Sequence, residues 1–204
     1  EGKLQEIAQK YKLEELVTAD ASFDEIAEKD SDWAYIKQKG ELVIGITLFQ
    51  PMNYFDDAGE LTGFETEFAK AVCEKLGVKA VFQEISWNAK ETELQAKNID
   101  CIWNGFTMEG REDDYTFSEP YMLNEQVIVV KSDSGITDFA GLADKTVVTQ
   151  VDSAALDVLE GDQADLAGTF AELQTLSDYN NAFMQLESGM VDAVACDLSI
   201  AQYQ

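Results

Sequence analysis

Arg111 is the residue whose type and position point most clearly to chemistry, because it is the only arginine in a chain of 204 residues. It follows the segment Trp103–Gly110, which contains two glycines and continues from a predicted buried strand. A guanidinium can donate two parallel hydrogen bonds to one carboxylate. We therefore expect Arg111 to bind a ligand carboxylate. The alternative is a salt bridge to the neighbouring Glu109, Glu112 or Asp113.

Two further positions could complete a site for a small zwitterion. Ser153 and Ala154 begin a predicted helix directly after a strand, and the N–H groups at a helix start attract anions. Simple N-capping by Ser153 is the alternative. Asp197 follows the apolar run Val191–Cys196, at the end of a strand, where ligands of open α/β sheets bind. Its carboxylate could receive an ammonium group, or it could cap a helix that begins near Ser199.

Aromatic residues follow the predicted strands at three places. Phe49, Trp87 and Phe106 each lie at the end of a strand or in the loop after it. Such side chains can form the walls of a small-molecule pocket, although aromatic residues of α/β proteins more often belong to the core. Together with an arginine, an aspartate and a helix start, they describe a site for a zwitterion.

The charge balance excludes several classes of function. Forty acidic residues against fourteen basic ones give a formal net charge of −26, so nucleic acids and anionic membrane surfaces would be repelled. The chain has no histidine, which excludes Ser-His-Asp and Cys-His catalysis and removes the commonest zinc ligand. Cys73, Cys101 and Cys196 form no C-x-x-C pair, and we expect them to be small buried side chains. We predict neither a metal nor a cofactor.

The elements that must position these residues alternate between helices and strands. Residues 1–38 are predicted to be helical, from the spacing of apolar residues such as Leu4 and Ile7 and from a capping box at Ser22–Glu25. The first lobe, residues 39–120, contains an amphipathic helix, Phe64–Leu76, which ends at Gly77. Its predicted strands are 42–48, 80–85 and 99–103, and a second helix runs from a cap at Asn88 to about Lys97. This order favours a parallel sheet covered by helices.

The second lobe, residues 121–204, repeats that pattern. Its predicted strands are 126–131, 145–151, 173–176 and 191–196, and its helices are 153–160 and 178–188. The segments Leu94–Asp100 and Leu186–Asp192 share the spacing of a leucine, a β-branched residue and an aspartate, which supports two similar lobes. The boundary is placed at Pro120, since a residue that precedes proline favours extended geometry.

A family resemblance extends from about Gly40 to Tyr203. It is carried by Gly40–Gly45, Leu61–Glu65, Asn98–Thr107, Arg111, Phe117–Tyr121, Gln150–Ala154 and Val191–Asp197. In these segments the chain resembles the periplasmic or lipid-anchored solute-binding proteins of polar amino-acid ABC transporters. The resemblance implies an α/β, two-lobed Venus-flytrap of the type II periplasmic-binding fold. Each lobe would hold a mixed, mostly parallel sheet flanked by helices, and the lobes would close on a free amino acid.

The same resemblance implies roles for individual residues. Arg111 would hold the α-carboxylate, helped by Thr107 and the backbone near Ser153. Asp197 would take the α-ammonium group together with carbonyls near Gly105. The full set of ligand-binding residues expected in this way is Phe49, Trp87, Asn104, Gly105, Phe106, Thr107, Arg111, Gln150, Ser153, Ala154 and Asp197.

The chain departs from the family pattern at two places. The segment Gly45–Phe49 lacks the acidic residue that cation-binding members often carry, so we expect a neutral polar amino acid as the ligand. The resemblance also stops before the usual return to the first lobe, whereas Glu1–Tyr11 resembles the family's C-terminal helix. Permuted ends, a tandem array or a truncated chain would each explain this. An exposed sheet edge would then favour a strand-exchanged homodimer or a tandem neighbour domain.

The function that the resemblance implies is delivery of the amino acid to the membrane permease of an ABC transporter. The protein would be exported and either periplasmic or lipid-anchored on the outer face of the cytoplasmic membrane. One alternative is a ligand-sensing domain of a receptor. The other is a dehydratase-like enzyme on the same fold, for which Glu84, Glu109 or Glu119 could supply the carboxyl group. Of these alternatives, we expect a binding protein that catalyses no reaction.

Overall fold

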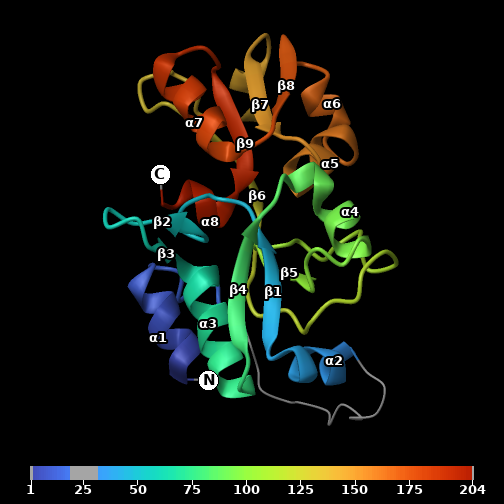
Figure 1. Ribbon diagram of the computed structural model, residues 1–204. Coiled ribbons are helices and arrows are strands. Elements are labelled where there is room, and N and C mark those ends of the chain that lie inside the picture. The colour runs from blue at the N-terminus through green and yellow to red at the C-terminus, as the bar shows by residue number, and fades with distance from the viewer. Residues whose placement is uncertain (1, 19–31, 204) are drawn as a thin grey trace. The chain divides into compact units, whose positions relative to one another are not determined.

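The computed structural model describes residues 2–18 and 32–203, and its chain divides into two compact units (Figure 1). Unit 1 holds the described residues up to Ile85 together with Ala89–Leu123, and unit 2 holds Ser86–Asn88 and the described residues from Asn124 onward. Each unit has its own sheet and its own apolar core. The predicted capping box at 22–25 lies outside the described residues.

The sheet of unit 1 is parallel and has the strand order β4-β1-β5. Strand β1 (Glu41–Ile46) lies in the middle and pairs with β4 (Lys79–Glu84) along its whole length. Strand β5 (Cys101–Ile102) is shorter than the predicted strand 99–103 and pairs only with Ile44 and Gly45. A parallel sheet must bury both faces, which explains the nearly continuous apolar run of β1.

Helices and a hairpin surround the sheet of unit 1. The predicted amphipathic helix is confirmed as α3 (Phe64–Leu76), which ends at Gly77 in the left-handed conformation. Asn88 does not cap the next helix, because a short 3-10 turn, η1 (Trp87–Ala89), precedes α4 (Lys90–Gln95). The remaining elements are α1 (Gly2–Lys10), α2 (Asp32–Lys39) and the hairpin of β2 (Tyr54–Phe55) and β3 (Leu61–Thr62). The core unites Ile36, Ile44, Ile46, Ala69, Cys73 and Val78.

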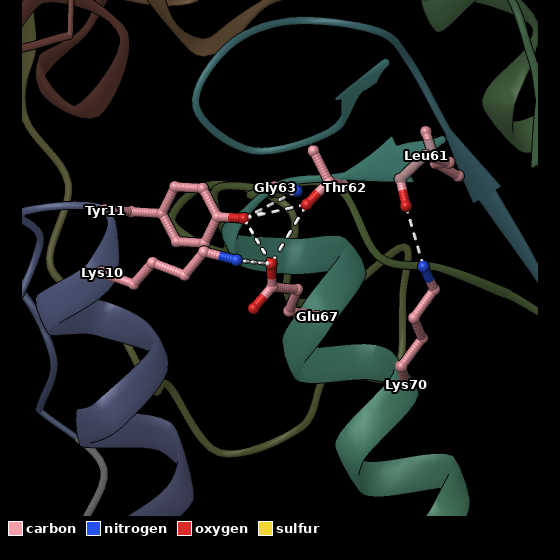
Figure 2. A network of polar contacts seen from close by, with 7 residues as sticks. All are labelled: Lys10, Tyr11, Leu61, Thr62, Gly63, Glu67 and Lys70. Atoms are coloured by element: carbon pink, nitrogen blue, oxygen red, sulfur yellow. Dashed lines mark hydrogen bonds and ion pairs between the residues drawn. The ribbon is translucent and has the colours of Figure 1, made fainter. Parts of the chain in front are cut away.

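Helix α1 is attached to α3 by a network of polar contacts (Figure 2). The Tyr11 hydroxyl donates to Glu67 at 2.6 Å and accepts the backbone N–H of Gly63 at 3.1 Å. Lys10 forms an ion pair with the same Glu67 carboxylate, and Thr62 donates to it at 3.1 Å. Because one carboxylate of α3 receives donors from the last residue of α1, from Tyr11 and from strand β3, Glu67 fixes the N-terminal helix to the rest of unit 1.

The sheet of unit 2 has four strands in the order β6-β9-β7-β8. Strand β6 (Gln126–Val130) runs antiparallel to β9 (Ala193–Asp197), whereas β7 (Thr146–Gln150) is parallel to both β9 and β8 (Glu172–Leu176). The sheet is therefore mixed but mostly parallel, as expected. Its core unites Leu142, Val147, Ala155, Leu159, Ala193 and Ala195.

The two longest helices of unit 2 begin at side chains that cap them. Ser153 accepts the N–H of Leu156 and begins α5 (Ala154–Glu160), and Asp178 accepts the N–H of Asn181 and begins α7 (Tyr179–Ser188). Three short helical segments, η2 (Phe139–Leu142), α6 (Ala164–Ala167) and α8 (Leu198–Ala201), complete the unit. Within the described ranges, no helix has the length and apolar character needed to cross a membrane.

The three cysteines are free thiols, as predicted. Cys73 and Cys196 are buried, and burial raises the pKa of all three thiols, that of Cys101 to about 12. In 2–18 and 32–203, no group of three or more His, Cys, Asp or Glu residues could hold a metal ion.

Candidate functional site

Arg111 lies in unit 1, in the irregular segment that follows β5. Its Nη1 donates to the carbonyl oxygen of Thr107 at 3.3 Å, and its guanidinium carbon lies 5.2 Å from the centre of the Phe106 ring. Phe106 in turn packs edge-on against Tyr115, with ring centres 4.9 Å apart, and against Phe117. An aromatic face stabilises a guanidinium and limits the directions in which it can point.

The loop before Arg111 is anchored by a buried polar network. The side-chain oxygen of Asn104 accepts the backbone N–H of Thr47 at 2.8 Å and the amide of Asn53 at 2.9 Å. The Asn104 amide donates to the Thr47 hydroxyl at 2.6 Å, and Thr66 donates to Asn53 at 2.8 Å. These contacts fix the buried Asn104 side chain and with it the start of the loop. Sequence reasoning named Asn104 but could not assign this anchoring role.

The adjacent residue, Gly105, has a φ of +60°, a conformation that glycine adopts without strain. Its backbone lies beside the carboxylate of Glu65, a residue of α3 that is only 1% exposed, and its N–H favours the ionised form of that carboxylate. Tyr121 donates its hydroxyl to both oxygens of the same carboxylate, at 2.9 Å each. Burial raises the pKa of Glu65 to about 7, although hydrogen bonds from Tyr121, Trp103 and Gly105 oppose the shift.

Glu65 and Tyr121 were missed as candidate residues by sequence reasoning. They are 56 positions apart, and both belong to segments that were quoted only for the family resemblance. Trp103 completes the cluster: its Nε1 is enclosed and forms no well-aligned hydrogen bond with the described residues, yet its N–H is near enough to favour the ionised form of Glu65. The enclosed carboxylate is therefore surrounded by donors alone.

Phe49 is buried in unit 1 directly after β1. Its backbone N–H donates to the carbonyl of Asn53 at 2.8 Å, and its own carbonyl accepts the N–H groups of Met52 and Asn53. These contacts form a tight turn that joins Phe49 to Asn53, whose side chain donates to Asn104. The candidate residues Phe49, Asn104, Gly105, Phe106, Thr107 and Arg111 thus all belong to unit 1.

The remaining candidates, Trp87, Gln150, Ser153, Ala154 and Asp197, belong to unit 2. Ser153 acts as the N-cap that was proposed as the alternative, and its own N–H donates to the Gln150 carbonyl at 3.3 Å. The first N–H groups of α5, from Ala154 onward, have no acceptor within the helix. The side-chain amide of Gln150 donates to the carbonyl of Ser177 at 3.0 Å, so it supports the neighbouring loop.

Asp197 ends β9 with its carboxylate partly exposed. One carboxylate oxygen accepts the side-chain amides of Asn124 at 2.6 Å and Gln126 at 2.8 Å. Its side chain makes no capping hydrogen bond to α8, although the residue stands at the start of that helix. The two side-chain amides therefore hold the carboxylate in place.

Tyr179 is a further residue that sequence reasoning missed. It is buried at the start of α7, and burial raises the pKa of its hydroxyl strongly, with the charge of Asp197 adding to the shift. The hydroxyl groups of Ser153 and Thr149 partly oppose this shift. Tyr179 thus stays neutral beside the carboxylate of Asp197.

Trp87 is buried, and its indole N–H donates to the carbonyl of Asp152 at 2.9 Å. Ser86–Asn88 belong to unit 2, as Asp152 does, whereas the sequence analysis placed the whole range 39–120 in one lobe. A contact between residues 65 positions apart cannot be read from sequence periodicity.

Comparisons with known proteins agree with this fold. The family model for bacterial extracellular solute-binding proteins, family 3, matches residues 42–174. The L-cystine-binding protein TcyA of Bacillus subtilis is 32% identical over 179 residues, which are 86% of this chain and 65% of TcyA. The L-cystine-binding protein TcyJ of Escherichia coli is 30% identical over 166 residues, which are 79% of this chain and 60% of TcyJ. The chain thus spans less than two thirds of these two relatives.

A solved structure extends the likeness to three dimensions. The crystal structure of an ABC uptake transporter substrate binding protein from Streptococcus pneumoniae with bound histidine has a TM-score of 0.81 and 32% sequence identity. The alignment covers 87% of this chain and 73% of that chain. This confirms the expected class of fold, the type II periplasmic-binding fold.

Proposed function

Because the chain belongs to family 3 of the bacterial extracellular solute-binding proteins, we propose that it binds a free amino acid and delivers it to the permease of an ABC transporter. The observation that carries this proposal is the geometry of Arg111, the only arginine of the chain. Its guanidinium is supported by the Phe106 ring and by the Thr107 carbonyl on a loop that Asn104 anchors. That arrangement suits a carboxylate ligand, which a guanidinium can bind through two hydrogen bonds.

The α-ammonium group of the amino acid would be taken by Asp197. Its carboxylate is oriented by the side-chain amides of Asn124 and Gln126, and a carboxylate can pair with an ammonium group. A zwitterion would supply a carboxylate for Arg111 and an ammonium group for Asp197, and charges removed from water are stabilised when they are paired.

For the side chain of the ligand we propose a neutral polar group. The segment Gly45–Phe49 carries no acidic residue that could pair with a cationic side chain. Two of the relatives are cystine-binding proteins and a third holds histidine, so L-cystine and L-histidine should be the first amino acids tried. The proteins of this family are described as extracellular. We therefore place this chain outside the cytoplasm as well, either in the periplasm or lipid-anchored.

The test is a thermal-shift screen against the twenty amino acids and cystine, followed by calorimetry of the responders. A ligand that binds only the folded state raises the melting temperature by mass action. The variant Arg111→Lys keeps the charge but loses the bidentate geometry, and we expect it to weaken binding at least ~10-fold, because each 1.4 kcal/mol is a factor of ten. Exposed Lys75→Ala serves as the control for loss of a cation and should bind like the wild type.

Three outcomes would contradict the proposal. They are the absence of any responder in a chain that melts cooperatively, wild-type affinity in Arg111→Lys, and chemical turnover of the responding amino acid. Turnover would favour the dehydratase-like alternative instead.

A further inference from the structure

The buried carboxylate of Glu65 connects two functional segments of unit 1. It lies beside the backbone of Gly105, in the loop that leads to Arg111, and both its oxygens accept the Tyr121 hydroxyl at 2.9 Å. Tyr121 lies two residues before Leu123, where the chain leaves unit 1. Although Tyr121 as a whole is partly exposed, its hydroxyl is enclosed with Glu65. One buried group therefore contacts both the binding loop and the end of the unit.

The polar groups around Glu65 are suited to an ionised carboxylate, whereas its burial opposes ionisation. An ionised carboxylate only accepts hydrogen bonds, and the neighbouring polar groups are donors: the Tyr121 hydroxyl, the Gly105 N–H and the Trp103 indole N–H. A protonated carboxyl would offer one acceptor fewer. Phe68 packs edge-on against both Trp103 and Tyr121, with ring centres 5.3 and 5.1 Å apart, and so holds these donors in place.

The groups that face this cluster are neutral near pH 7. Tyr121 has a pKa raised well above its ordinary value by burial and by the charge of Glu65. Cys101, on β5, is the titratable thiol near Tyr121, and burial raises its pKa to about 12, so it is also neutral near pH 7. On α3 itself, Glu67 is engaged by Lys10 and Tyr11. Glu65 is thus the group of this cluster that changes charge near neutral pH, with a pKa of about 7.

The contact with Gly105 also orients the neighbouring carbonyl. In a trans peptide the N–H and the C=O point in opposite directions, so a Gly105 N–H aimed at Glu65 directs the Asn104 carbonyl away from it. Gly105 can adopt this peptide orientation because glycine reaches a φ of +60° without strain. Carbonyls of this segment are those expected to share in binding the α-ammonium group.

We propose that Glu65 is a positioning residue, whose ionised carboxylate holds the Gly105 loop and Tyr121 in the binding-competent arrangement and whose protonation weakens binding of the amino acid. The affinity part of this inference rests on the proposed function. The positioning part concerns the ligand-free chain and can be tested without any ligand.

The first experiment is a pH titration of the ligand-free protein by ¹⁵N–¹H NMR, from pH 5 to pH 8.5. We expect the Gly105 amide resonance of the wild type to move with a midpoint near 7 and to stay in place in Glu65→Gln. Tyr121→Phe keeps the ring but removes a donor to the carboxylate, so its midpoint should move to higher pH. Glu74→Gln, an exposed change on the same helix, should titrate like the wild type. A Gly105 resonance that is indifferent to pH, or that titrates unchanged in Glu65→Gln, would overturn the proposal even if no amino acid binds.

The second experiment is calorimetry with the responding amino acid at pH 6 and pH 8. If binding lowers the pKa of Glu65 by one unit, affinity should rise by up to ~10-fold as the pH rises through its titration. Glu65→Gln should bind more weakly at pH 8 and lose this dependence, while Glu74→Gln should keep it. A pH dependence that persists in Glu65→Gln would refute the coupling. A chain that binds no amino acid at either pH, but shows the Gly105 titration, would refute the proposed function and leave the positioning of the loop established.

Discussion

Asp100 and Val43 exchange two hydrogen bonds, although 57 residues separate them. The carboxylate of Asp100 accepts the backbone N–H of Val43 at 2.6 Å, and the N–H of Asp100 donates to the Val43 carbonyl at 2.8 Å. Unit 2 contains the same arrangement, in which Asp192 and Thr146 make both contacts at 2.9 Å. The shared spacing of Leu94–Asp100 and Leu186–Asp192 thus corresponds to one structural device, an aspartate that binds the adjacent strand of each sheet.

Replacement of this aspartate should destabilise the unit that contains it. In Asp100→Asn the amide can no longer provide a charged acceptor for Val43 or an ion pair for Lys39, whose Nζ lies 2.7 Å from the carboxylate. We expect a loss of about 1–3 kcal/mol in the free energy of unfolding, measured by urea denaturation. Asp192→Asn should have a similar effect. Exposed Asp57→Asn is the control, and equal stability of the Asp57 and Asp100 variants would contradict the prediction.

Glu65 should make the stability of the chain depend on pH with a definite sign. Burial raises its pKa from 4.5 to about 7 in the folded chain. Between these values the unfolded chain has lost the proton and the folded chain retains it, so stability is highest below pH 4.5 and falls as the pH rises through 7. At about 1.4 kcal/mol per pKa unit, the loss amounts to roughly 3 kcal/mol.

The measurement is urea denaturation of the wild type and of Glu65→Gln at several pH values from 4.5 to 8. The difference between the two isolates Glu65 from the other carboxylates, which titrate in both proteins. As the pH rises, the free energy of unfolding of the wild type should fall relative to that of Glu65→Gln. A difference that stays constant over this range would show that Glu65 does not titrate there.

The polar network in Figure 2 should contribute to the attachment of α1. In Tyr11→Phe the Gly63 N–H loses its acceptor and Glu67 loses a donor, while the ring remains. We expect a cost of about 1–3 kcal/mol in the free energy of unfolding, because buried polar groups are left unsatisfied. Tyr35→Phe, at an exposed ring, is the matched control. If the two variants are equally stable, the apolar face of α1 alone secures the helix.

Local signals in the sequence determined most of the elements. The apolar stripe of α3 and the terminal Gly77 predicted that helix at its observed bounds, and Ser153 was identified as an N-cap. Such features depend on residues within one or two helical turns, so they can be read without knowledge of the fold. The lone Arg111 was recognisable for a similar reason, since its rarity in an acidic chain is a property of composition.

Tertiary structure alone decided which distant residues act together. Nothing in the sequence around Glu65 or Tyr121 indicates that their side chains meet, and the burial that raises the pKa of Glu65 exists only after α3, the Trp103 segment and Tyr121 have packed together. The hydrogen bond from the Trp87 indole to the Asp152 carbonyl likewise joins residues 65 positions apart. Hydrogen bonds between residues so far apart depend on the final packing of the chain, and a pattern confined to neighbouring residues carries no information about it.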